Sequence, residues 1–449
     1  MNTSKRMSRR AFVQTASAAG IGLPLAISSA ALTSAAGGAA PSDKLRHAAI
    51  GCGGMAAMDL REIAKSPHVE IVALCDIDDS PLGAAKGRHG KAETFYDFRK
   101  MFDKLAGRID SCNVTVPDHM HAPIAMWALE RGIHVYGQKP LTHEIVEARR
   151  LREKAAEKKV VTQMGIQIHS HPAYRTAVRL VQDGAIGPVK EVHTWADRAW
   201  SNGGRGKPQT PPPNVHWDLW LGVAAERPWA PGVYHPNRWW SWMDFGTGNL
   251  GDMGCHLLDP VVNALQLGPP TRITAECDPP KNETWPNRGK VHYEFPKSPH
   301  TAGPIKLTWY DGHGHKPSAN LVPLKKGEGL PGQGSILIGE KGILVIPHWS
   351  TPKLYPQETF AGYKYPDVGA PDHWLSFVNA CRGEGKTTAG FDYAGPLTET
   401  VLLGNLAKRF PGQPLEWNAE QLKVTNFAEA NQFTMRKYRQ GWDVPGLSG

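Results

Sequence analysis

A strand, a glycine-rich turn and a helix are predicted near the start of the chain, and together they constrain its fold more than any other feature. Residues 51–56 read Gly51-Cys52-Gly53-Gly54-Met55-Ala56 and follow directly on the short apolar run 48–50. Gly51 permits a tight turn, and Gly53 lets the backbone approach a pyrophosphate. The small Ala56 lets the helix pack closely on the strand, and the helix N-terminus offers N–H groups to phosphates.

A second strand-like run, Val69–Cys75, ends at Asp76, about twenty residues after the turn. A carboxylate at this place accepts the ribose hydroxyls of NAD, so the pattern predicts a dinucleotide-binding domain. Asp76, with Asp78 and Asp79 close behind it, would repel the 2′-phosphate of NADP, and we therefore expect NAD rather than NADP. The alternative is a glycine turn in an α/β protein that holds no ligand.

The first part of the chain has the pattern of an export signal. Ser8-Arg9-Arg10-Ala11-Phe12-Val13 places two arginines before an apolar residue, and an alanine-rich stretch follows up to about Ala40. This predicts a twin-arginine signal peptide over residues 1–40 and a periplasmic or otherwise exported protein. The alternatives are an amphipathic leader and an anchor that stays uncleaved. No other apolar run is long enough to span a membrane, so we expect no membrane partner after cleavage.

Charge and cysteine content argue against two further classes of protein. The leader carries four positive charges and no acid, so the rest of the chain is only mildly basic. We find no stripe of Lys and Arg with interleaved aromatics, and nucleic acid is not an expected partner. The six cysteines are scattered singly without a C-x-x-C pair, which argues against a disulfide framework and leaves at most one bridge open.

About four hundred residues after the leader imply two domains. From residue 44 to 165 strand-like and helix-like segments alternate, which predicts a parallel sheet with helices on both faces, a Rossmann domain. In residues 166–449 the strand candidates are grouped and the helices lie apart, which predicts an α+β substrate domain on an open, mostly antiparallel sheet. Its strand candidates are 189–195, 273–277, 291–295, 305–310 and the hairpin 336–346, its helices are 174–182, 371–381 and 395–409, and a loop rich in Gly, Pro and Trp occupies 201–245.

Three polar clusters fall where chemistry is expected in such a fold. They read Thr115-Val116-Pro117-Asp118-His119-Met120-His121, Gly137-Gln138-Lys139-Pro140, and the stretch from Gly248 to Asp259. The first two follow predicted strands, and ligands of a parallel sheet bind at the carboxyl ends of its strands. In the third, Asp252 and His256 are four residues apart, so a helical turn would place both on one face.

These motifs, in this order, resemble the Gfo/Idh/MocA family of oxidoreductases, which includes glucose–fructose oxidoreductase and inositol dehydrogenase. The segment His216–Gly222 and the Trp239-Trp240 region resemble an exported bacterial branch of this family. The resemblance covers the chain after the leader and implies that Lys139, Asp252 and His256 surround the reacting hydroxyl of a sugar or polyol. Gln138 stands where the family usually has Glu, which leaves the electrostatic tuning of Lys139 open. We expect the cofactor to be held by Gly51, Gly53, Gly54, Met55, Ala56, Asp76, Thr115, Pro117, His121, Gln138 and Lys139.

The chemistry of alcohol oxidation agrees with this resemblance. It requires a proton acceptor and a hydride acceptor on the two sides of one carbon. His256, with an imidazole near its ordinary pKa, is expected to take the hydroxyl proton, and Lys139 to stabilise the developing alkoxide. Asp252 would orient the imidazole or bind a neighbouring hydroxyl. The alternative is that Lys139 is a surface residue before a proline turn and His256 a core histidine.

Repeated histidines and tryptophans suggest further sites. The pairs His119/His121, His169/His171 and His313/His315 lack third and fourth ligands at a known spacing, so we expect no metal and place them in solvated loops or at substrate contacts. Eight tryptophans crowd one stretch and are typical of a carbohydrate cleft, of loop packing or of an oligomer interface, and we expect at least half to be structural. They are Trp195, Trp200, Trp217, Trp220, Trp229, Trp239, Trp240 and Trp242.

The predicted protein is an NAD-dependent oxidoreductase of a small sugar or polyol, and we expect it to form a homo-oligomer. Two other classes remain open. One is a redox-neutral glycosidase or lyase that works through a transient keto-sugar with the same NAD. The other is a non-catalytic sugar-binding protein on the same scaffold, against which the retention of Lys139, Asp252 and His256 argues. The sequence does not separate the oxidoreductase from the redox-neutral enzyme.

Overall fold

The computed structural model describes residues 44–199 and 204–447. The twin-arginine signal predicted for residues 1–40 lies outside these residues, as do Trp200 and the first residues of the predicted Gly/Pro/Trp-rich loop. Within the described parts of the chain, no helix combines the length and the apolar character needed to cross a membrane. All six cysteines are free thiols, and four of them are buried.

The first sheet has six parallel strands in the order β3-β2-β1-β4-β5-β6, which confirms the predicted Rossmann domain. Because the chain order reverses between β1 and β4, the carboxyl ends of these two strands form the crevice in which such sheets bind ligands. The strands are β1 (Leu45–Ile50), β2 (Val69–Cys75), β3 (Glu93–Phe95), β4 (Ser111–Val114), β5 (His134–Gly137) and β6 (Thr162–Met164), and the helices are α2 (Gly54–Ile63), α3 (Asp79–Arg88), α4 (Phe98–Lys104), α5 (His121–Glu130) and α6 (Ile145–Lys158).

The second sheet has nine strands in the order β13-β12-β11-β7-β10-β9-β8-β14-β15. Only β7 and β10 pair in parallel among these described strands, so the sheet is mostly antiparallel, as predicted. Burial alternates along β9, as expected for a sheet with one face on the core. The strands are β7 (Val189–Ala196), β8 (Arg272–Cys277), β9 (Gly289–Phe295), β10 (Thr301–Asp311), β11 (Gly334–Gly339), β12 (Ile343–Pro347), β13 (Lys353–Tyr355), β14 (Leu415–Asn418) and β15 (Lys423–Val424).

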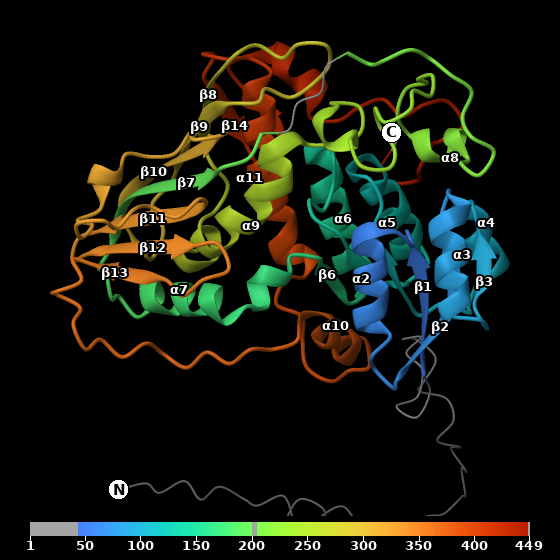
Figure 1. Cartoon of the computed structure of the whole chain (residues 1–449), viewed down its shortest axis with the longest axis horizontal. Coiled ribbons are helices and arrows are strands. Elements are labelled where there is room, and N and C mark those ends of the chain that lie inside the picture. Colours follow the sequence, from blue (N-terminus) through green and yellow to red (C-terminus); the bar gives the residue numbers. More distant parts are fainter. Residues whose placement is uncertain (1–43, 200–203, 448–449) are drawn as a thin grey trace, which may run out of the picture. The chain divides into compact units, whose positions relative to one another are not determined.

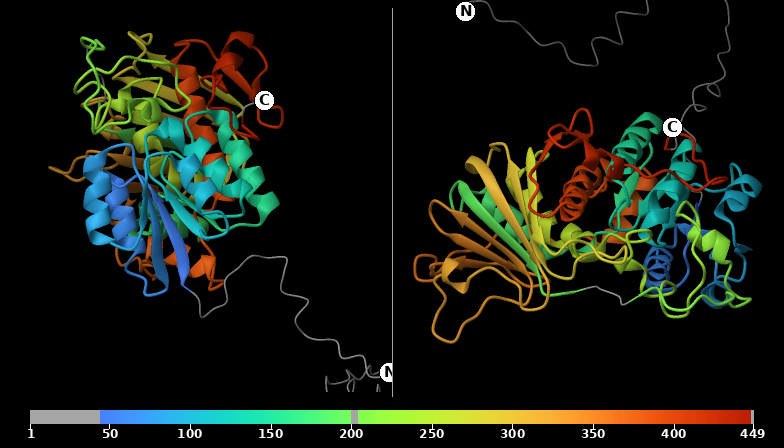
Figure 2. Two further views of the ribbon diagram at one scale, coloured as in Figure 1. Left: turned by 90° about the vertical axis from the view of Figure 1, so that its right-hand side faces the viewer. Right: turned by 90° about the horizontal axis from the view of Figure 1, so that it is seen from above.

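Helices α9 and α11 pack on the second sheet and lie between it and the Rossmann domain, and α7 packs against α9 and β12 (Figure 1, Figure 2). The helix α9 is apolar around most of its circumference, which explains its burial between two layers. The helices of this part are α7 (Pro172–Gln182), α8 (Trp217–Leu221), α9 (Gly248–Leu265), α10 (His373–Cys381) and α11 (Phe391–Lys408), and the short 3-10 helices of the whole chain are η1 (Asp118–Met120), η2 (Gln167–Ser170), η3 (Trp239–Ser241), η4 (Ala319–Leu321) and η5 (Ala428–Phe433).

The end of the chain returns to the first domain. Helix α11 packs along α6, and the ring of Phe377 in α10 meets that of Tyr136 at 5.7 Å. The hydroxyl of Tyr438 donates to Glu147 of α6 at 2.6 Å. The boundary predicted after residue 165 therefore separates the strands of the two sheets. The helices that follow residue 370 pack against elements of both domains.

Candidate functional site

The predicted glycine turn connects β1 to α2 and is built at very close range. Gly51 has a φ of +91°, and a Cβ at this position would lie 2.0 Å from the carbonyl oxygen of Thr115 and 3.2 Å from the Cβ of Ala56. Both the backbone conformation and the lack of space therefore require glycine. Gly53 directly precedes α2, so no side chain at this position blocks the N-terminus of the helix, as a pyrophosphate site requires.

Asp76 lies at the carboxyl end of β2, next to this turn. Its carboxylate accepts hydrogen bonds from the backbone N–H groups of Cys52 (2.7 Å) and Asp78 (3.0 Å). Burial raises the pKa of Asp76, and these two donors oppose that rise. The carboxylate is thus tied to the glycine turn at the edge where the sequence predicts the cofactor ribose. Met55, another predicted cofactor contact, exposes its side chain in the first turn of α2.

The cluster after β4 is tied to its neighbours by side-chain hydrogen bonds. Thr115 donates its hydroxyl to Asp59 at 2.9 Å. The ring of His121 lies between the carbonyl oxygens of Val116 and Pro140, 2.7 Å from each. Burial lowers the pKa of His121 to about 4, so the ring is neutral and donates to one of the two oxygens, and it packs between the loops that follow β4 and β5. Direct contact between His121 and the cofactor stays a prediction.

Gln138 stands where the related family usually has Glu, and its contacts explain the difference. Its Nε2 donates to the carboxylate of Asp59 (3.0 Å), and its Oε1 accepts from the backbone N–H of Lys139 (3.0 Å). Asp59, on α2, is fully buried and also accepts from Thr115 and from the indole of Trp374 (2.8 Å). A glutamate at position 138 would set a second carboxylate against Asp59, where two like charges cannot both ionise. The neutral amide satisfies the buried carboxylate and holds the backbone that carries Lys139.

Lys139 and Asp252 form an ion pair that joins the two domains. The Nζ of Lys139, in the loop after β5, lies 2.5 Å from Asp252 Oδ1 and 3.1 Å from the carbonyl oxygen of the same residue on α9. Burial alone would lower the pKa of Lys139, but Asp252 raises it above its ordinary value. Burial alone would raise the pKa of Asp252, and Lys139 lowers it. Both groups are therefore charged at neutral pH. The Lys139 side chain is only 17% exposed and paired, which excludes the alternative that it is a surface residue.

His256 lies one turn beyond Asp252 on α9, so the predicted same-face spacing is confirmed. Its Nδ1 is buried and has no hydrogen-bond partner within the described parts of the chain. Burial, the charge of Lys139 and the neighbouring His348 lower the pKa of His256 well below 6.5. The expectation of an imidazole near its ordinary pKa was therefore wrong. The ring is neutral at physiological pH and retains a nitrogen without a protein partner.

Asp118 is a buried carboxyl group beside this ion pair. It follows Pro117 and accepts hydrogen bonds from the backbone N–H (3.0 Å) and the hydroxyl (2.6 Å) of Thr247, just before α9. Burial raises the pKa of Asp118 to about 7, although Thr247 and Lys139 oppose the rise. Asp118 belongs to the first polar cluster of the sequence, residues 115–121, but its spacing from the other polar residues did not indicate a role.

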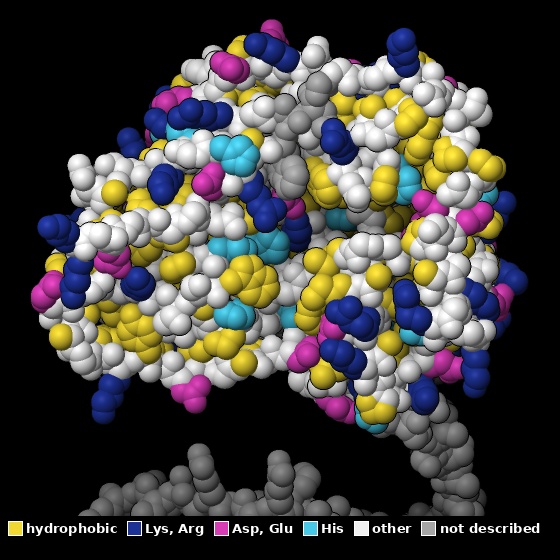
Figure 3. Space-filling model, in the orientation of Figure 1, with side chains coloured by type: hydrophobic (Ala, Val, Ile, Leu, Met, Phe, Trp, Pro, Cys, Tyr) yellow, Lys and Arg dark blue, Asp and Glu magenta, His cyan; other side chains and the backbone are white. Residues whose placement is uncertain are grey.

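Three further residues near His256 had no signal in the sequence. The ring centroid of His348 lies 5.8 Å from that of His256, and the hydroxyl of Tyr174 lies 2.9 Å from Nδ1 of His348. Arg198 approaches Asp252 at 4.0 Å. Histidine side chains gather near the middle of the face shown in Figure 3. These residues come from α7 and from the ends of β7 and β12, so no local spacing relates them to α9.

In the described part of the chain, neither the three histidine pairs nor other residues form a group of three or more His, Cys, Asp or Glu arranged to hold a metal. Of the two placements expected for them, the solvated loop is wrong for His119, His121 and His169, which are buried, and contact with a substrate stays a prediction. His119 bonds the carbonyl oxygen of Trp220 at 3.0 Å. His169 pairs with Asp259 at 2.8 Å.

The tryptophan-rich segment packs largely on itself. Among its described tryptophans, Trp195, Trp220, Trp229 and Trp242 are buried, which supports the expectation that at least half are structural. The rings of Trp217 and Trp220 stack at 4.6 Å, and these rings form a separate apolar cluster together with Tyr234 and Phe245.

The same segment closes over the end of β2. The backbone of Asn214 accepts from the N–H of Asp79 (3.0 Å), and its side chain donates to Asp78 (3.0 Å). His235 bonds the other oxygen of Asp78 at 2.9 Å, and the ring of His216 lies 4.0 Å from that of Tyr96. Residues 204–245 therefore cover the loop that directly follows Asp76.

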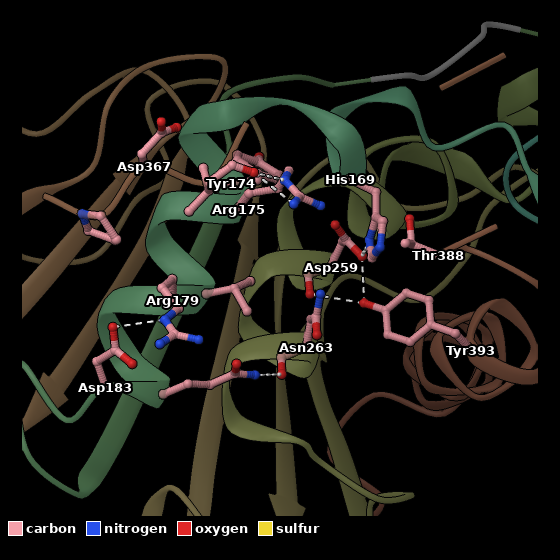
Figure 4. A pocket seen from close by; sticks show the side chains of 14 residues that line it. His169, Tyr174, Arg175, Arg179, Asp183, Asp259, Asn263, Asp367, Thr388 and Tyr393 are labelled. Carbon is pink, nitrogen blue, oxygen red and sulfur yellow. Dashed lines mark hydrogen bonds and ion pairs between the residues drawn. The ribbon is translucent and has the colours of Figure 1, made fainter. Parts of the chain in front are cut away.

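A cavity of about 670 Å³ lies between α7, α9 and the start of α11, and Lys139, Asp252 and His256 do not line it (Figure 4). At its inner end, Asp259 Oδ1 lies 2.8 Å from Nδ1 of His169 and accepts from Tyr393 at 2.5 Å. Burial alone would lower the pKa of His169, but Asp259 raises it. Tyr174 lines the cavity and also bonds His348, so it is common to the cavity and the candidate site.

Comparison with known proteins agrees with this architecture. Residues 45–166 match the family model described as "Oxidoreductase family, NAD-binding Rossmann fold", and residues 179–297 match "Oxidoreductase family, C-terminal alpha/beta domain". The first match confirms the predicted NAD-binding domain. The dTDP-3,4-didehydro-2,6-dideoxy-α-D-glucose 3-reductase of Streptomyces violaceoruber is 34% identical over 158 residues, and the inositol 2-dehydrogenase of Rubrobacter xylanophilus is 29% identical over 158 residues. Each match covers 34% of this chain and 44% of the relative, less than half of its length.

Solved structures share the whole two-domain fold. The WlbA dehydrogenase from Bordetella pertussis, in complex with NADH and UDP-GlcNAcA, has a TM-score of 0.59 at 17% identity and covers 84% of this chain and 99% of its own. The aldose-aldose oxidoreductase from Caulobacter crescentus, complexed with glycerol, has a TM-score of 0.56 at 17% identity and covers 83% of this chain and 100% of its own. At these identities the likeness establishes the fold.

Proposed function

Because the chain belongs to the Gfo/Idh/MocA family of oxidoreductases, we propose that it transfers a hydride between a sugar or polyol hydroxyl carbon and NAD. One observation carries this proposal. The loop after β5 and the helix α9 bring Lys139, Asp252 and His256 together, with Lys139 and Asp252 in direct contact. Similar proteins are named as a sugar reductase and an inositol dehydrogenase, which supports the substrate class.

The residues around the glycine turn fit a dinucleotide. The approach of Gly51 to Thr115 leaves no room for a side chain, as the tight turn requires, and Gly53 would let the backbone approach a pyrophosphate. Asp76 would hold the adenosine ribose and disfavour the 2′-phosphate of NADP. Met55, at the start of α2, and Gln138, after β5, would make further contacts to the cofactor. When bound, NAD supplies the hydride acceptor or donor.

The side chains of the second domain would handle the proton. A neutral His256 accepts the hydroxyl proton of the substrate when the carbon is oxidised, and returns it in the reverse direction. The Lys139 ammonium stabilises the negative charge that develops on the oxygen, and its effect is strong because the pair is largely buried. Asp252 fixes Lys139 and favours the imidazolium that forms on His256.

The test incubates the purified protein with a panel of sugars, polyols and glycosides, with and without added NAD or NADP, and follows NADH and organic products. K139A and H256A should each lower turnover by about 10²–10⁴-fold while NAD binding, measured by calorimetry, stays intact. K325A and H313A are matched controls, because Lys325 and His313 are exposed and lie outside the site.

Each outcome has a separate meaning. Loss of NAD affinity in K139A and H256A, with unchanged turnover per bound cofactor, would contradict the assigned roles. Cleaved or eliminated products without net NADH would replace the oxidoreductase with the redox-neutral glycosidase or lyase. Binding of sugars without any turnover would favour the sugar-binding protein. Equal or tighter binding of NADP than of NAD would contradict the role of Asp76.

A further inference from the structure

Trp349, in the turn after β12, combines an exposed side chain with an unfavourable backbone. Its φ is +63°, in the left-handed region that bulky residues rarely adopt, and its side chain is 51% exposed. An exposed position does not by itself require a tryptophan, and a positive φ is unfavourable for one, so the presence of Trp349 here calls for another reason. Backbone outliers of this kind concentrate at ligand sites.

Two anchored histidines hold the indole. The ring of His171 meets it at 5.4 Å and 74°, and the ring of His348 meets it at 5.6 Å and 67°. His171 caps the start of α7 by accepting from the N–H of Ala173, and His348 bonds the hydroxyl of Tyr174. Neither imidazole stacks parallel on the indole, and half of its surface remains accessible.

The indole lies next to the catalytic centre without being part of it. The ring of His348 is near both side chains, with centroid distances of 5.8 Å to His256 and 5.6 Å to Trp349. A substrate ring whose hydroxyl is held by His256 and Lys139 would therefore extend past His348 toward Trp349. Because His348 rather than Trp349 is the aromatic neighbour of His256, Trp349 would meet the neighbouring ring of a larger substrate rather than the reacting ring.

We propose that Trp349 is the stacking platform of an outer sugar subsite, and that the substrate is a glycoside or oligosaccharide rather than a free monosaccharide. Sugar rings present apolar C–H faces, which pack on an indole face, and their hydroxyls find hydrogen-bonding partners in the imidazoles of His171 and His348. The subsite rests on the proposed function for the position of the reacting ring.

The experiment measures binding separately from turnover. Calorimetry compares the disaccharides cellobiose, maltose and lactose with glucose and galactose, for the NAD-loaded protein and for W349A, W349F and W349G. W349A should lower the affinity for the disaccharides that bind about tenfold and leave that for the monosaccharides unchanged, whereas W349F should retain most of the affinity. Y363A is the matched control, because Tyr363 is another exposed aromatic whose ring packs on Phe360 and Tyr365.

W349G separates loss of stacking from loss of fold. Glycine adopts a positive φ without strain, so W349G should bind like W349A and unfold at a temperature no lower than W349A does. An equal loss for monosaccharides and disaccharides, or no loss, would overturn the subsite. Two other results would also overturn the subsite. One is a change in the molecular mass of the Trp349 variants in solution with unchanged sugar binding. The other is that the protein binds UDP, but none of the disaccharides, in a manner that depends on Trp349. Trp349-dependent disaccharide binding without turnover of any sugar would leave the subsite standing and overturn the proposed oxidoreductase instead.

Discussion

Gln138 donates a hydrogen bond to the buried carboxylate of Asp59 and accepts one from the backbone N–H of Lys139. Asp59 therefore stabilises the loop that carries Lys139. We expect Q138E to lower the free energy of unfolding by about 1–3 kcal/mol, because it places two carboxyl groups within hydrogen-bond distance in a buried site. The loss in stability and in turnover should grow as the pH rises, since the proton that the two groups share is then removed. Urea unfolding and turnover measured from pH 6 to 9 check both effects.

The double variant D59N/Q138E is the control for this prediction. In it the amide stands at position 59 and the carboxylate at position 138, so the hydrogen bond between the two positions is restored with donor and acceptor exchanged. It should regain most of the stability and activity lost in Q138E. A Q138E protein as stable and active at pH 9 as the unmodified protein would show that Asp59 does not position Lys139.

Asp118 makes the stability of the protein depend on pH. The unfolded chain gives up this proton near pH 3.8, whereas the folded protein keeps it until about pH 7. Between these values the unfolded state binds fewer protons, so the free energy of unfolding falls as the pH rises, by at most about 1.4 kcal/mol per pH unit. D118N retains an acceptor for Thr247 and does not titrate. It should therefore gain stability relative to the unmodified protein from pH 4 to 7.

Urea unfolding at four pH values in this range measures the difference. D103N serves as the comparison, because Asp103 is an exposed carboxylate on the same domain. A constant difference between D118N and the unmodified protein across the range would mean that Asp118 is already ionised in the folded state.

Among the elements, the segment 204–245 has the most direct consequence for the cofactor. It covers the loop after Asp76 through Asn214 and His235, both bonded to Asp78. The double variant N214A/H235A removes both contacts and leaves Asp76 and the glycine turn unchanged. We expect NAD to leave about tenfold faster, at little cost in association rate, because differences between related complexes lie mostly in the off-rate.

Stopped-flow displacement of bound NADH, followed by its fluorescence, measures this rate. N237A is the control, since Asn237 is exposed in the same segment. An off-rate equal to that of the unmodified protein would assign the segment a purely structural role.

For the whole molecule, the predicted twin-arginine signal and the NAD-binding domain lead to one prediction. This export route carries folded proteins, and an extracytoplasmic compartment has no pool of free nicotinamide nucleotide. We therefore expect NAD to be loaded before export and carried out bound, and the catalytic cycle to regenerate it in place. The protein purified without added nucleotide and then denatured should release close to one NAD per chain.

Cell fractionation of R9K/R10K tests the export signal separately, because lysines should not replace the paired arginines. The unmodified protein should be found in the exported fraction and the variant in the cytoplasm. Little NAD per chain, together with activity that requires added NAD, would contradict the carried cofactor. Equal distribution of both proteins would contradict the signal.

The sequence alone determined the features that depend on neighbouring residues. The turn from Gly51 to Ala56 was predictable because a tight strand–helix connection requires small residues at fixed places. The alternation of strands and helices gave the parallel sheet, and the grouped strands gave the second, mostly antiparallel sheet. The spacing of Asp252 and His256 placed both on one face of α9, because a helix repeats every three to four residues.

Only the tertiary structure decided which distant residues meet and how burial changes them. Asp59 joins Gln138 and Trp374, which lie far apart along the chain, and His348, after β12, reaches His256 on α9. No local sequence pattern indicates that the end of the chain packs against α6. None indicates that residues 204–245 cover the loop after β2. The low pKa of His256 could not be read from its motif either. A pKa depends on the solvent and charges that packing removes or brings near, and packing is a property of the whole fold.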